Sequence, residues 1–115
     1  MKRVIKFYRT ETNKCYIEEF MDSLNDKVAQ KILAVFKIIE SDEIVSSKFF
    51  KKLTGIDIWE CRIIWKSDIY RILGFFDKNN FVVLTNGFQK KKQKTPRNEI
   101  ENAIKYMNDY KRRSK

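Results

Sequence analysis

The chain has 115 residues, of which 43% are hydrophobic and 35% are charged, and its formal net charge is +10. This length suits one domain with a real hydrophobic core, and the apolar content is too high for a disordered chain. The sequence contains no histidine, which excludes imidazole acid–base chemistry and histidine-ligated metal sites. Cys15 and Cys61 are too far apart in sequence to form a metal-ligand pattern, and we expect both to be reduced thiols.

The positive charge is concentrated near the end of the sequence. Residues 1–86 contain 15 Lys or Arg and 12 Asp or Glu, whereas residues 87–115 contain 10 and 3. Such a basic surface favours binding to nucleic acid or to an anionic membrane surface. No apolar run approaches the roughly 20 residues that span a bilayer, and the start MKRVIKFYRT lacks the apolar segment of a signal peptide. We therefore expect a cytoplasmic protein.

The first half of the sequence predicts a strand followed by a helical hairpin. Apolar residues from Val4 onward predict a strand of about six residues, and residues 10–23 predict a polar helix. Asn25 is a suitable N-cap for a second helix, which follows with almost no loop. The apolar stripe of this second helix consists of Val28, Ile32, Val35, Phe36 and Ile39.

The second half predicts a basic connection at residues 46–55, an antiparallel meander of three strands and a last helix. Thr95 is the expected N-cap and Pro96 the first residue of that helix. We expect a single α+β domain over residues 1–115, in the order β-α-α-β-β-β-α, with residues 110–115 frayed. The three strands are expected at 58–65, 69–76 and 81–88, because these segments are rich in β-branched and aromatic residues.

Strand alternation assigns side chains to the two faces of this predicted sheet. One face of the strand at 58–65 is apolar and should lie under helices, because it carries Trp59, Cys61, Ile63 and Trp65. Two assumed hairpin registers place Arg71 opposite Ile64, Phe76 opposite Phe81 and Asn86 opposite Arg71. The other, exposed face would then collect Glu60, Arg62, Arg71, Asn86 and Lys90. The lysine run that follows can curl over this face, and a phosphate backbone is the natural ligand.

Three segments of the sequence, LTGIDIWECR, IYRILGFF and VVLTNGFQKKKQKTPRNEIENA, resemble the RelE/HigB family of bacterial toxins, in particular its phage-type HigB-like branch. The resemblance covers roughly residues 50–108. It implies a RelE-like fold, a small mostly antiparallel sheet with helices packed on one face and RNA on the other. It also implies an mRNA endonuclease of a type II toxin–antitoxin pair, which acts in the ribosomal A site. The 2′-hydroxyl would be the nucleophile, giving a cyclic phosphate and a 5′-hydroxyl.

The resemblance also implies roles for individual residues. Arg62 and Arg71 match cations that grip the scissile phosphate, and Lys90 and Lys91 match further phosphate ligands. Glu60 either accepts the 2′-hydroxyl proton or holds Arg62 in place. Family members often protonate the leaving oxygen with a tyrosine or histidine near the C-terminal end. This sequence has no histidine and no tyrosine in its basic run, so a lysine, water or ribosomal RNA must serve instead. We further expect RNA binding by Lys48, Lys51, Lys52, Asn86, Lys92 and Lys94.

The expected partners are mRNA, the ribosome and a cognate antitoxin, a small helix-turn-helix protein that covers or distorts the basic face. No metal or other cofactor is expected, because the arginines and lysines supply the positive charge. Two other readings stay open. One is a gyrase-inhibiting relative on the same fold, and the other is a non-catalytic RNA- or ribosome-binding module, in which Glu60 and Arg62 are an ordinary ion pair. Cleavage in the presence of translating ribosomes separates a nuclease from both.

Overall fold

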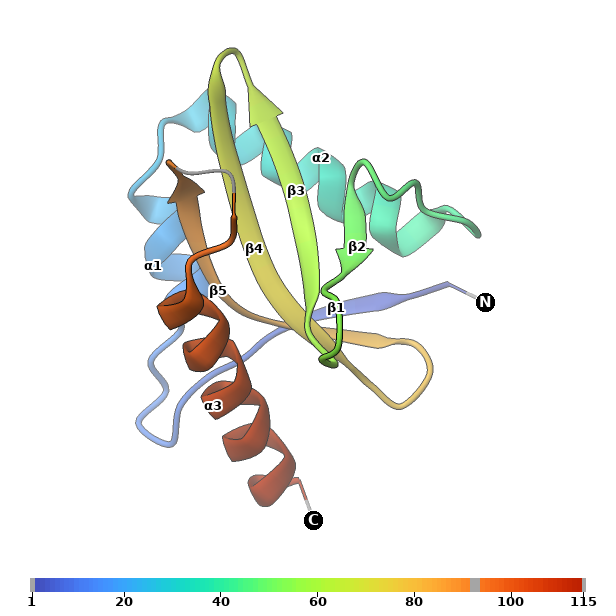
Figure 1. The fold of residues 1–115 in the computed structure, drawn as a ribbon, viewed down its shortest axis with the longest axis vertical. Coiled ribbons are helices and arrows are strands. Elements are labelled where there is room, and N and C mark those ends of the chain that lie inside the picture. The colour runs from blue at the N-terminus through green and yellow to red at the C-terminus, as the bar shows by residue number, and fades with distance from the viewer. Residues whose placement is uncertain (1, 92–93, 115) are drawn as a thin grey trace.

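A computed structural model describes residues 2–91 and 94–114 of the chain. Its centre is a five-stranded sheet in the order β1-β5-β4-β3-β2, with helices packed on it (Figure 1). β1 runs parallel to β5, and the other neighbouring strands are antiparallel. The strands are β1 (Val4–Phe7), β2 (Phe50–Lys52), β3 (Trp59–Trp65), β4 (Asp68–Asp77) and β5 (Phe81–Lys90). The helices are α1 (Tyr16–Asp22), α2 (Asp26–Ser41) and α3 (Arg97–Arg113).

The hairpin of α1 and α2 covers one face of the sheet, as the apolar stripe predicts. Asn25 is the N-cap of α2, because its Oδ1 accepts a hydrogen bond from the Val28 backbone N–H at 3.0 Å. The whole predicted stripe of α2 is buried, and it packs against the apolar face of β3, which includes Cys61 and Ile63. Each fully buried aliphatic side chain of this kind stabilises the fold by about 1.5–3 kcal/mol. Trp59 and Trp65 pack against the same core, as their face predicts.

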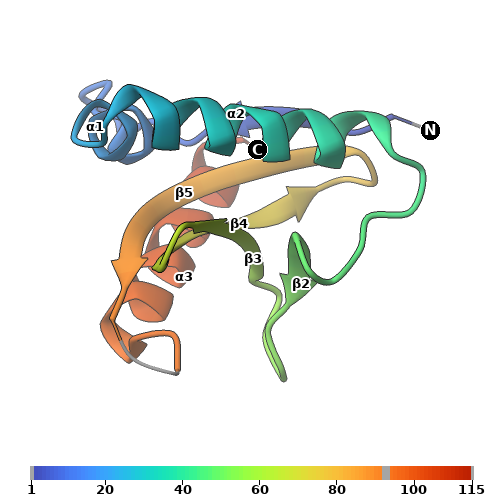
Figure 2. The ribbon, with the colours of Figure 1, turned by 90° about the horizontal axis from the view of Figure 1, so that it is seen from above.

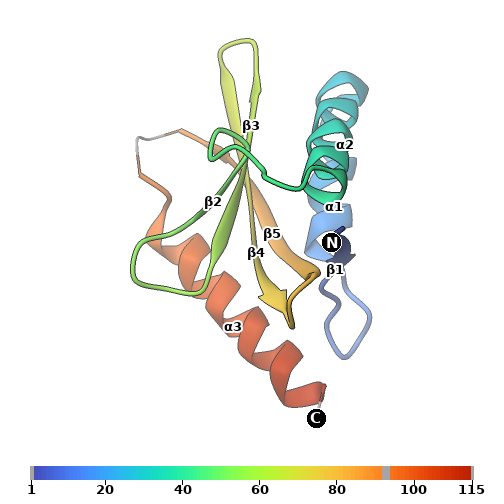
Figure 3. The ribbon, with the colours of Figure 1, turned by 90° about the vertical axis from the view of Figure 1, so that its right-hand side faces the viewer.

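The opposite face of the sheet is covered by α3, so the expectation that helices pack on one face only is wrong. Figures 2 and 3 show α1 and α2 on one side of the sheet and α3 on the other. The physical reason is a second apolar surface, where Ile58 just before β3, Leu73 of β4 and Phe88 of β5 are buried against Ala103 of α3. The charged side chains of this face lie next to the first turn of α3, where the helix no longer covers the sheet.

The β3–β4 hairpin turns at Lys66 and Ser67, with Trp65 opposite Asp68. Lys66 has a φ of 55°, the left-handed conformation that two-residue hairpin turns require. Arg71 consequently lies opposite Arg62 and not opposite Ile64, so the assumed register is wrong by two residues. A shift of two residues preserves the face of every side chain, because strand side chains alternate with a period of two. Arg71 therefore stays on the Arg62 face.

The β4–β5 register also differs from the assumption. Phe81 lies opposite Asp77 and not opposite Phe76, a shift of one residue that would put Asn86 and Lys90 on the wrong face. An irregularity between Leu73 and Gly74 adds a second shift of one residue in the same direction, and the total of two residues restores the predicted faces. Asn86 then lies opposite Leu73, two residues from the predicted partner but on the predicted face.

Gly74 stands at this irregularity because the strands approach each other closely there. A Cβ on Gly74 would lie 2.5 Å from the Val83 carbonyl oxygen and 2.9 Å from Leu84 Cδ2. Backbone atoms cannot move aside as the end of a flexible side chain can, so this position favours glycine. The bulge, and with it the face of Lys90, thus depends on one residue without a side chain.

Three further expectations need correction. The helix predicted over residues 10–23 begins only at Tyr16, because Thr10 and Lys14 close a turn in which Asn13 has a φ of 67°. The basic connection at 46–55 contains the short strand β2, which pairs with β3. The tail is not frayed from residue 110, because α3 continues to Arg113.

Both cysteines are buried and free, as expected. Cys61 lies in the apolar core under α2, and burial raises the pKa of its thiol. This environment makes Cys61 an inert core side chain. In the described part of the chain, no helix is both long enough and apolar enough to cross a membrane.

Candidate functional site

Glu60 of β3 is the centre of a buried charged cluster on the α3 side of the sheet. Its side chain is 3% exposed. Its Oε1 lies 3.3 Å from Nε of Arg62 and 3.3 Å from Nε of Arg71. Its Oε2 accepts a hydrogen bond from the hydroxyl of Thr95. One carboxylate therefore holds two guanidinium groups together, and the segment before α3 is tied to it.

The register of the β3–β4 hairpin explains why this carboxylate is needed. Arg62 and Arg71 face each other directly across the two strands, and directly opposed like charges destabilise a sheet. Glu60 is on the same face as both arginines, two residues before Arg62. Its negative charge offsets their repulsion, so two cations can lie side by side without destabilising the sheet.

The two arginines differ in exposure. The side chain of Arg71 is only 7% exposed, and its Nη1 donates a hydrogen bond to the Tyr70 carbonyl at 3.2 Å. Burial lowers the pKa of Arg71, and the neighbouring Arg62 adds to this, while Glu60 opposes it. The side chain of Arg62 is 32% exposed, so it is the more accessible of the two cations. Neither Nε is aligned for a hydrogen bond within the described residues, so both contacts with Glu60 are ionic.

Lys90 belongs to the same charged environment. It is the last residue of β5, lies opposite Ile69 and is partly buried. Burial lowers its pKa, the positive charges of Arg71 and Arg62 lower it further, and Glu60 acts in the opposite direction. A lysine of this kind loses its proton more readily than an exposed lysine. It is therefore the best candidate in the cluster for proton transfer.

The basic run after β5 leads back toward Glu60. Lys91 and Lys94 are exposed, while Lys92 lies outside the described residues. The hydrogen bond from Thr95 to Glu60 shows that the chain returns to the charged cluster before α3 begins. Thr95 was expected to cap α3, but α3 begins one residue later, with Pro96 at the N-cap position and no side-chain cap. The Thr95 hydroxyl is used by the cluster instead.

The lysines of the 46–55 connection take three different positions. Lys51 is exposed and lies opposite Glu60, so it is on the cluster side of the sheet. Lys52 pairs with Asp57 at 3.4 Å. Lys48 is exposed and lines a cavity at the edge of the sheet together with Arg62. Lys48 and Lys51 are thus the members of this group that lie near the cluster.

Asn86 lies on the predicted face, but its surroundings do not suit RNA binding. It is 6% exposed, and its Nδ2 donates to the backbone carbonyl of Glu99 at 3.2 Å and to Glu99 Oε1 at 3.0 Å. Its Oδ1 accepts a hydrogen bond from Thr85 at 2.6 Å. Because its amide is satisfied within the protein, Asn86 holds the first turn of α3 on the sheet.

The tyrosines of α3 and its neighbours lie toward the other end of this helix. Tyr106 stacks between Tyr8 and Tyr16, with ring centres 5.2 and 4.7 Å away. Tyr106 is nine residues beyond the start of α3, about 14 Å along a helix axis. This tyrosine cluster therefore packs the far part of the sheet and does not join Glu60. Among residues 2–91 and 94–114, no three His, Cys, Asp or Glu side chains gather as a metal site would require.

Sequence reasoning missed Thr95 as a partner of Glu60. The signal was present, because a threonine after the lysine run must lie near the face over which that run turns. It also missed Lys31, which lines the edge cavity with Arg62. Lys31 precedes the buried Val35 by one helical turn, and that spacing places it at the border of the α2 core face.

Fold and site together define a small α+β protein with a mixed sheet and a carboxylate-centred cluster of cations on one sheet face. The family model of the phage-derived Gp49-like proteins (DUF891) matches residues 19–108, and the chain belongs to this family. The family is a member of the RelE-like toxin superfamily, which supports a toxin role and suggests an antitoxin as partner. No curated protein matches the sequence.

Proposed function

We propose that this protein is an endoribonuclease that cleaves mRNA on the ribosome and is the toxin of a type II toxin–antitoxin pair. The observation that carries the proposal is the cluster in which Glu60 contacts both Arg62 and Arg71 beside Lys90. Two fixed guanidinium groups suit the non-bridging oxygens of a phosphodiester, which gain negative charge as the nucleophile attacks. Family membership adds support for the toxin role.

In this mechanism the 2′-hydroxyl oxygen attacks the adjacent phosphorus. A bond from O2′ to phosphorus forms, and the bond from phosphorus to O5′ breaks, leaving a 2′,3′-cyclic phosphate and a 5′-hydroxyl. One proton leaves the 2′-hydroxyl, and one proton is added to O5′. Arg62 and Arg71 stabilise the charge on the pentacoordinate phosphorus. Electrostatic stabilisers of this kind contribute about 10²–10³ in rate each.

Lys90 is the proposed proton donor to O5′. Its lowered pKa makes the transfer easier than from an exposed lysine, and the sequence offers no histidine for this role. Glu60 is better placed to position the arginines than to accept a proton, because both of its oxygens are engaged and it is buried. The 2′-hydroxyl proton would then pass to water or to a ribosomal group.

One observation favours a second candidate function, a non-catalytic RNA- or ribosome-binding module. The side chain of Arg71 is only 7% exposed, and a guanidinium this deep can be a structural partner of Glu60 and nothing more. In that case the exposed cations Lys51, Lys91 and Lys94 would bind RNA through its phosphates without cleaving it.

The decisive experiment is induced expression with mapping of mRNA 5′ ends. The wild type, Arg62→Ala and the control Lys37→Ala should be compared, since Lys37 is an exposed lysine of α2 that lines a different cavity. We expect growth arrest and cuts within translated codons for the wild type and the control, and neither for Arg62→Ala.

Two outcomes would contradict the proposal. Arrest without cuts would point to a gyrase-inhibiting relative, and binding to ribosomes without arrest or cuts would point to the non-catalytic module. We expect Arg62→Ala to keep the fold, because Arg62 is partly exposed and Glu60 keeps Arg71 and Thr95 as partners.

A further inference from the structure

A cavity of about 330 Å³ lies at the edge of the sheet, between α2 and β3. In Figure 1, α2 passes behind β3 at this edge. The volume is at the lower end of the range for small-molecule sites. The cavity is lined by Lys31, Val35, Lys48, Phe49, Arg62 and Ile64.

The charged side chains of this cavity are all positive. They are Lys31, Lys48 and Arg62, and none of the carboxylates in the described part of the chain lines the cavity. Within the described residues neither lysine forms an ion pair, whereas several other basic side chains of the fold do. Three cations around one hollow, two of them without an acidic partner there, suit an anionic ligand.

The remaining lining is apolar and includes an aromatic ring. Phe49 is partly buried, and Lys48 Nζ lies 5.9 Å from the centre of its ring. Ile64 is 55% exposed, so its side chain is accessible to a ligand. A flat apolar surface beside cations is the combination that single-stranded nucleic acid uses, with a base on the apolar part and a phosphate on the cations.

Another cavity in the fold shows that this combination is not general. A cavity of about 460 Å³ between β1 and α2 contains Glu40 as well as Lys37 and Arg9, and Arg9 is paired with Glu18 at 2.7 Å. Its charges are balanced, so it offers no preference for an anion. The charge pattern therefore distinguishes the edge cavity from this larger cavity.

Arg62 connects the edge cavity with the charged cluster. Its Nε faces Glu60 at 3.3 Å, while its Nη1 lies 3.5 Å from the Ser47 carbonyl oxygen, which precedes Lys48. The same guanidinium thus borders both sites. A ligand strand that places one phosphate at the cluster can place a neighbouring nucleotide in the cavity.

We propose that the edge cavity is a nucleotide subsite that binds one nucleotide of the RNA strand next to the cleaved bond. Lys31 and Lys48 hold its phosphate, and Phe49 and Ile64 contact its base. This proposal rests on the proposed RNA substrate, but it does not require cleavage. It assigns a binding role to Lys31 of α2, the helix whose buried side chains form part of the core.

The test is an NMR titration of the isolated protein, without ribosomes, with a nucleoside 5′-monophosphate, with the uncharged nucleoside and with inorganic phosphate. We expect the nucleotide to shift the amide signals of Val35, Phe49 and Ile64, and each fragment alone to shift them less. The double variant Lys31→Gln/Lys48→Gln should weaken nucleotide binding at least tenfold. The control Lys37→Gln removes an exposed charge from the same helix and should change the affinity less than twofold.

A short single-stranded RNA adds a second readout. Each neutralised phosphate contributes about 0.7 to the slope of the logarithm of affinity against the logarithm of salt concentration. Because Lys31 and Lys48 hold one phosphate, the double variant should lower this slope by about 0.7. The proposal is overturned if the nucleotide shifts only the region of Arg71 and Lys90, or if Lys37→Gln weakens binding equally. Binding in the cavity by a protein that does not cleave would retain the subsite and reject the nuclease.

Discussion

At the scale of single residues, the cluster shows which predictions from sequence were possible. Strand alternation placed Glu60, Arg62 and Arg71 on one face, and the structure brings all three into contact. Alternation could not reveal burial, because the second apolar surface that recruits α3 is formed by residues of three strands and becomes visible only when they pair. Arg71 was therefore expected to be exposed, whereas it is buried.

The burial of Arg71 changes the expected effect of removing it. An exposed sheet arginine contributes little to stability, so on an exposed face Arg71→Ala would leave the fold intact. Because Arg71 is buried against Glu60, the substitution should instead lower the free energy of unfolding by about 3 kcal/mol, the lower end for breaking a buried ion pair. Arg62 and Thr95 still satisfy Glu60, which limits the loss. Urea denaturation would measure it, and an unchanged midpoint would show that Arg71 is structurally dispensable.

Lys90 offers a test of proton transfer that is separate from charge. Lys90→Gln should reduce cleavage by about 10²–10⁴, the contribution of a general acid. Lys90→Arg keeps the positive charge but cannot give up a proton near neutral pH, so it should not restore activity. The protonated form of Lys90 is the active one, so wild-type activity should fall as pH rises. Because the pKa of Lys90 is lowered, this fall should begin at a lower pH than the titration of a free lysine would give.

Single-turnover cleavage as a function of pH would check this prediction. Lys90→Gln should not weaken the fold, because burial already disfavours the charged form of this side chain. Full activity in Lys90→Arg would contradict a role in proton transfer and would leave Lys90 as a phosphate ligand.

At the scale of elements, the bulge between Leu73 and Gly74 decides which side chains meet. The pairing assumed at the turn was wrong by one residue, yet Lys90 was placed on the correct face, because the bulge adds the compensating shift. Bulges are set by close backbone approach, here at Gly74, and hydrophobic alternation carries no signal for them. Conversely, α2 was predicted well, since a long apolar stripe and an Asn cap are local features.

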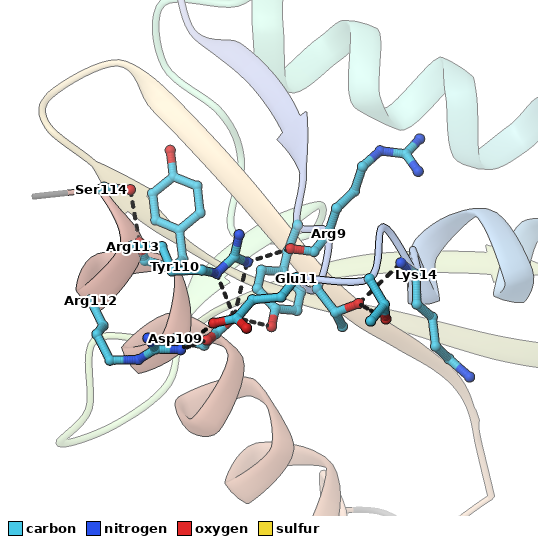
Figure 4. Close-up of polar contacts among 11 residues, drawn as sticks. Arg9, Glu11, Lys14, Asp109, Tyr110, Arg112, Arg113 and Ser114 are labelled. Atoms are coloured by element: carbon cyan, nitrogen blue, oxygen red, sulfur yellow. Dashed lines mark hydrogen bonds and ion pairs between the residues drawn. The ribbon is translucent and has the colours of Figure 1, made fainter.

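The end of α3 is held to the loop after β1 by a network around Asp109, shown in Figure 4. Asp109 accepts a hydrogen bond from the Tyr8 hydroxyl at 2.6 Å and pairs with Arg112 and Arg113. Arg112 also pairs with Glu11 at 3.0 Å. These contacts tie the two ends of the chain together and explain why the tail is helical.

Asp109 should therefore make stability depend on pH. The hydrogen bond from Tyr8, followed by that from Arg113, lowers the pKa of Asp109 to about 2. A lowered folded-state pKa adds stability that is present above the unfolded pKa of 3.8 and is lost as pH falls toward 2. Asp109→Asn should then be less stable than the wild type at pH 7, and the difference should shrink toward pH 2. Denaturation curves at both pH values would measure it, and an equal difference at both would contradict the assignment.

At the scale of the whole molecule, the sheet is a middle layer between two helical layers, and its two cores depend on different segments (Figure 3). The sequence indicated the α1–α2 layer through periodicity. It also indicated the apolar stripe of α3, but not the face on which α3 packs. That choice follows from the second apolar surface, which includes Phe75 and Val83 as well as Leu73. The candidate site exists because α3 covers only part of this surface.

Two truncations separate the contributions of α3. Ending the chain after residue 96 would expose Ile58, Leu73 and Phe88 together, and burying side chains of this size contributes about 1.5–3 kcal/mol each. Because small domains are stable by only about 5–15 kcal/mol, this protein should lose cooperative unfolding and aggregate. Ending the chain after residue 110 keeps the apolar stripe of α3 and removes Arg112 and Arg113, so it should stay folded with a modestly lower melting temperature. Thermal circular dichroism with size-exclusion chromatography distinguishes the two, and a cooperative, monomeric product of the longer deletion would show that the second core is not essential to the fold.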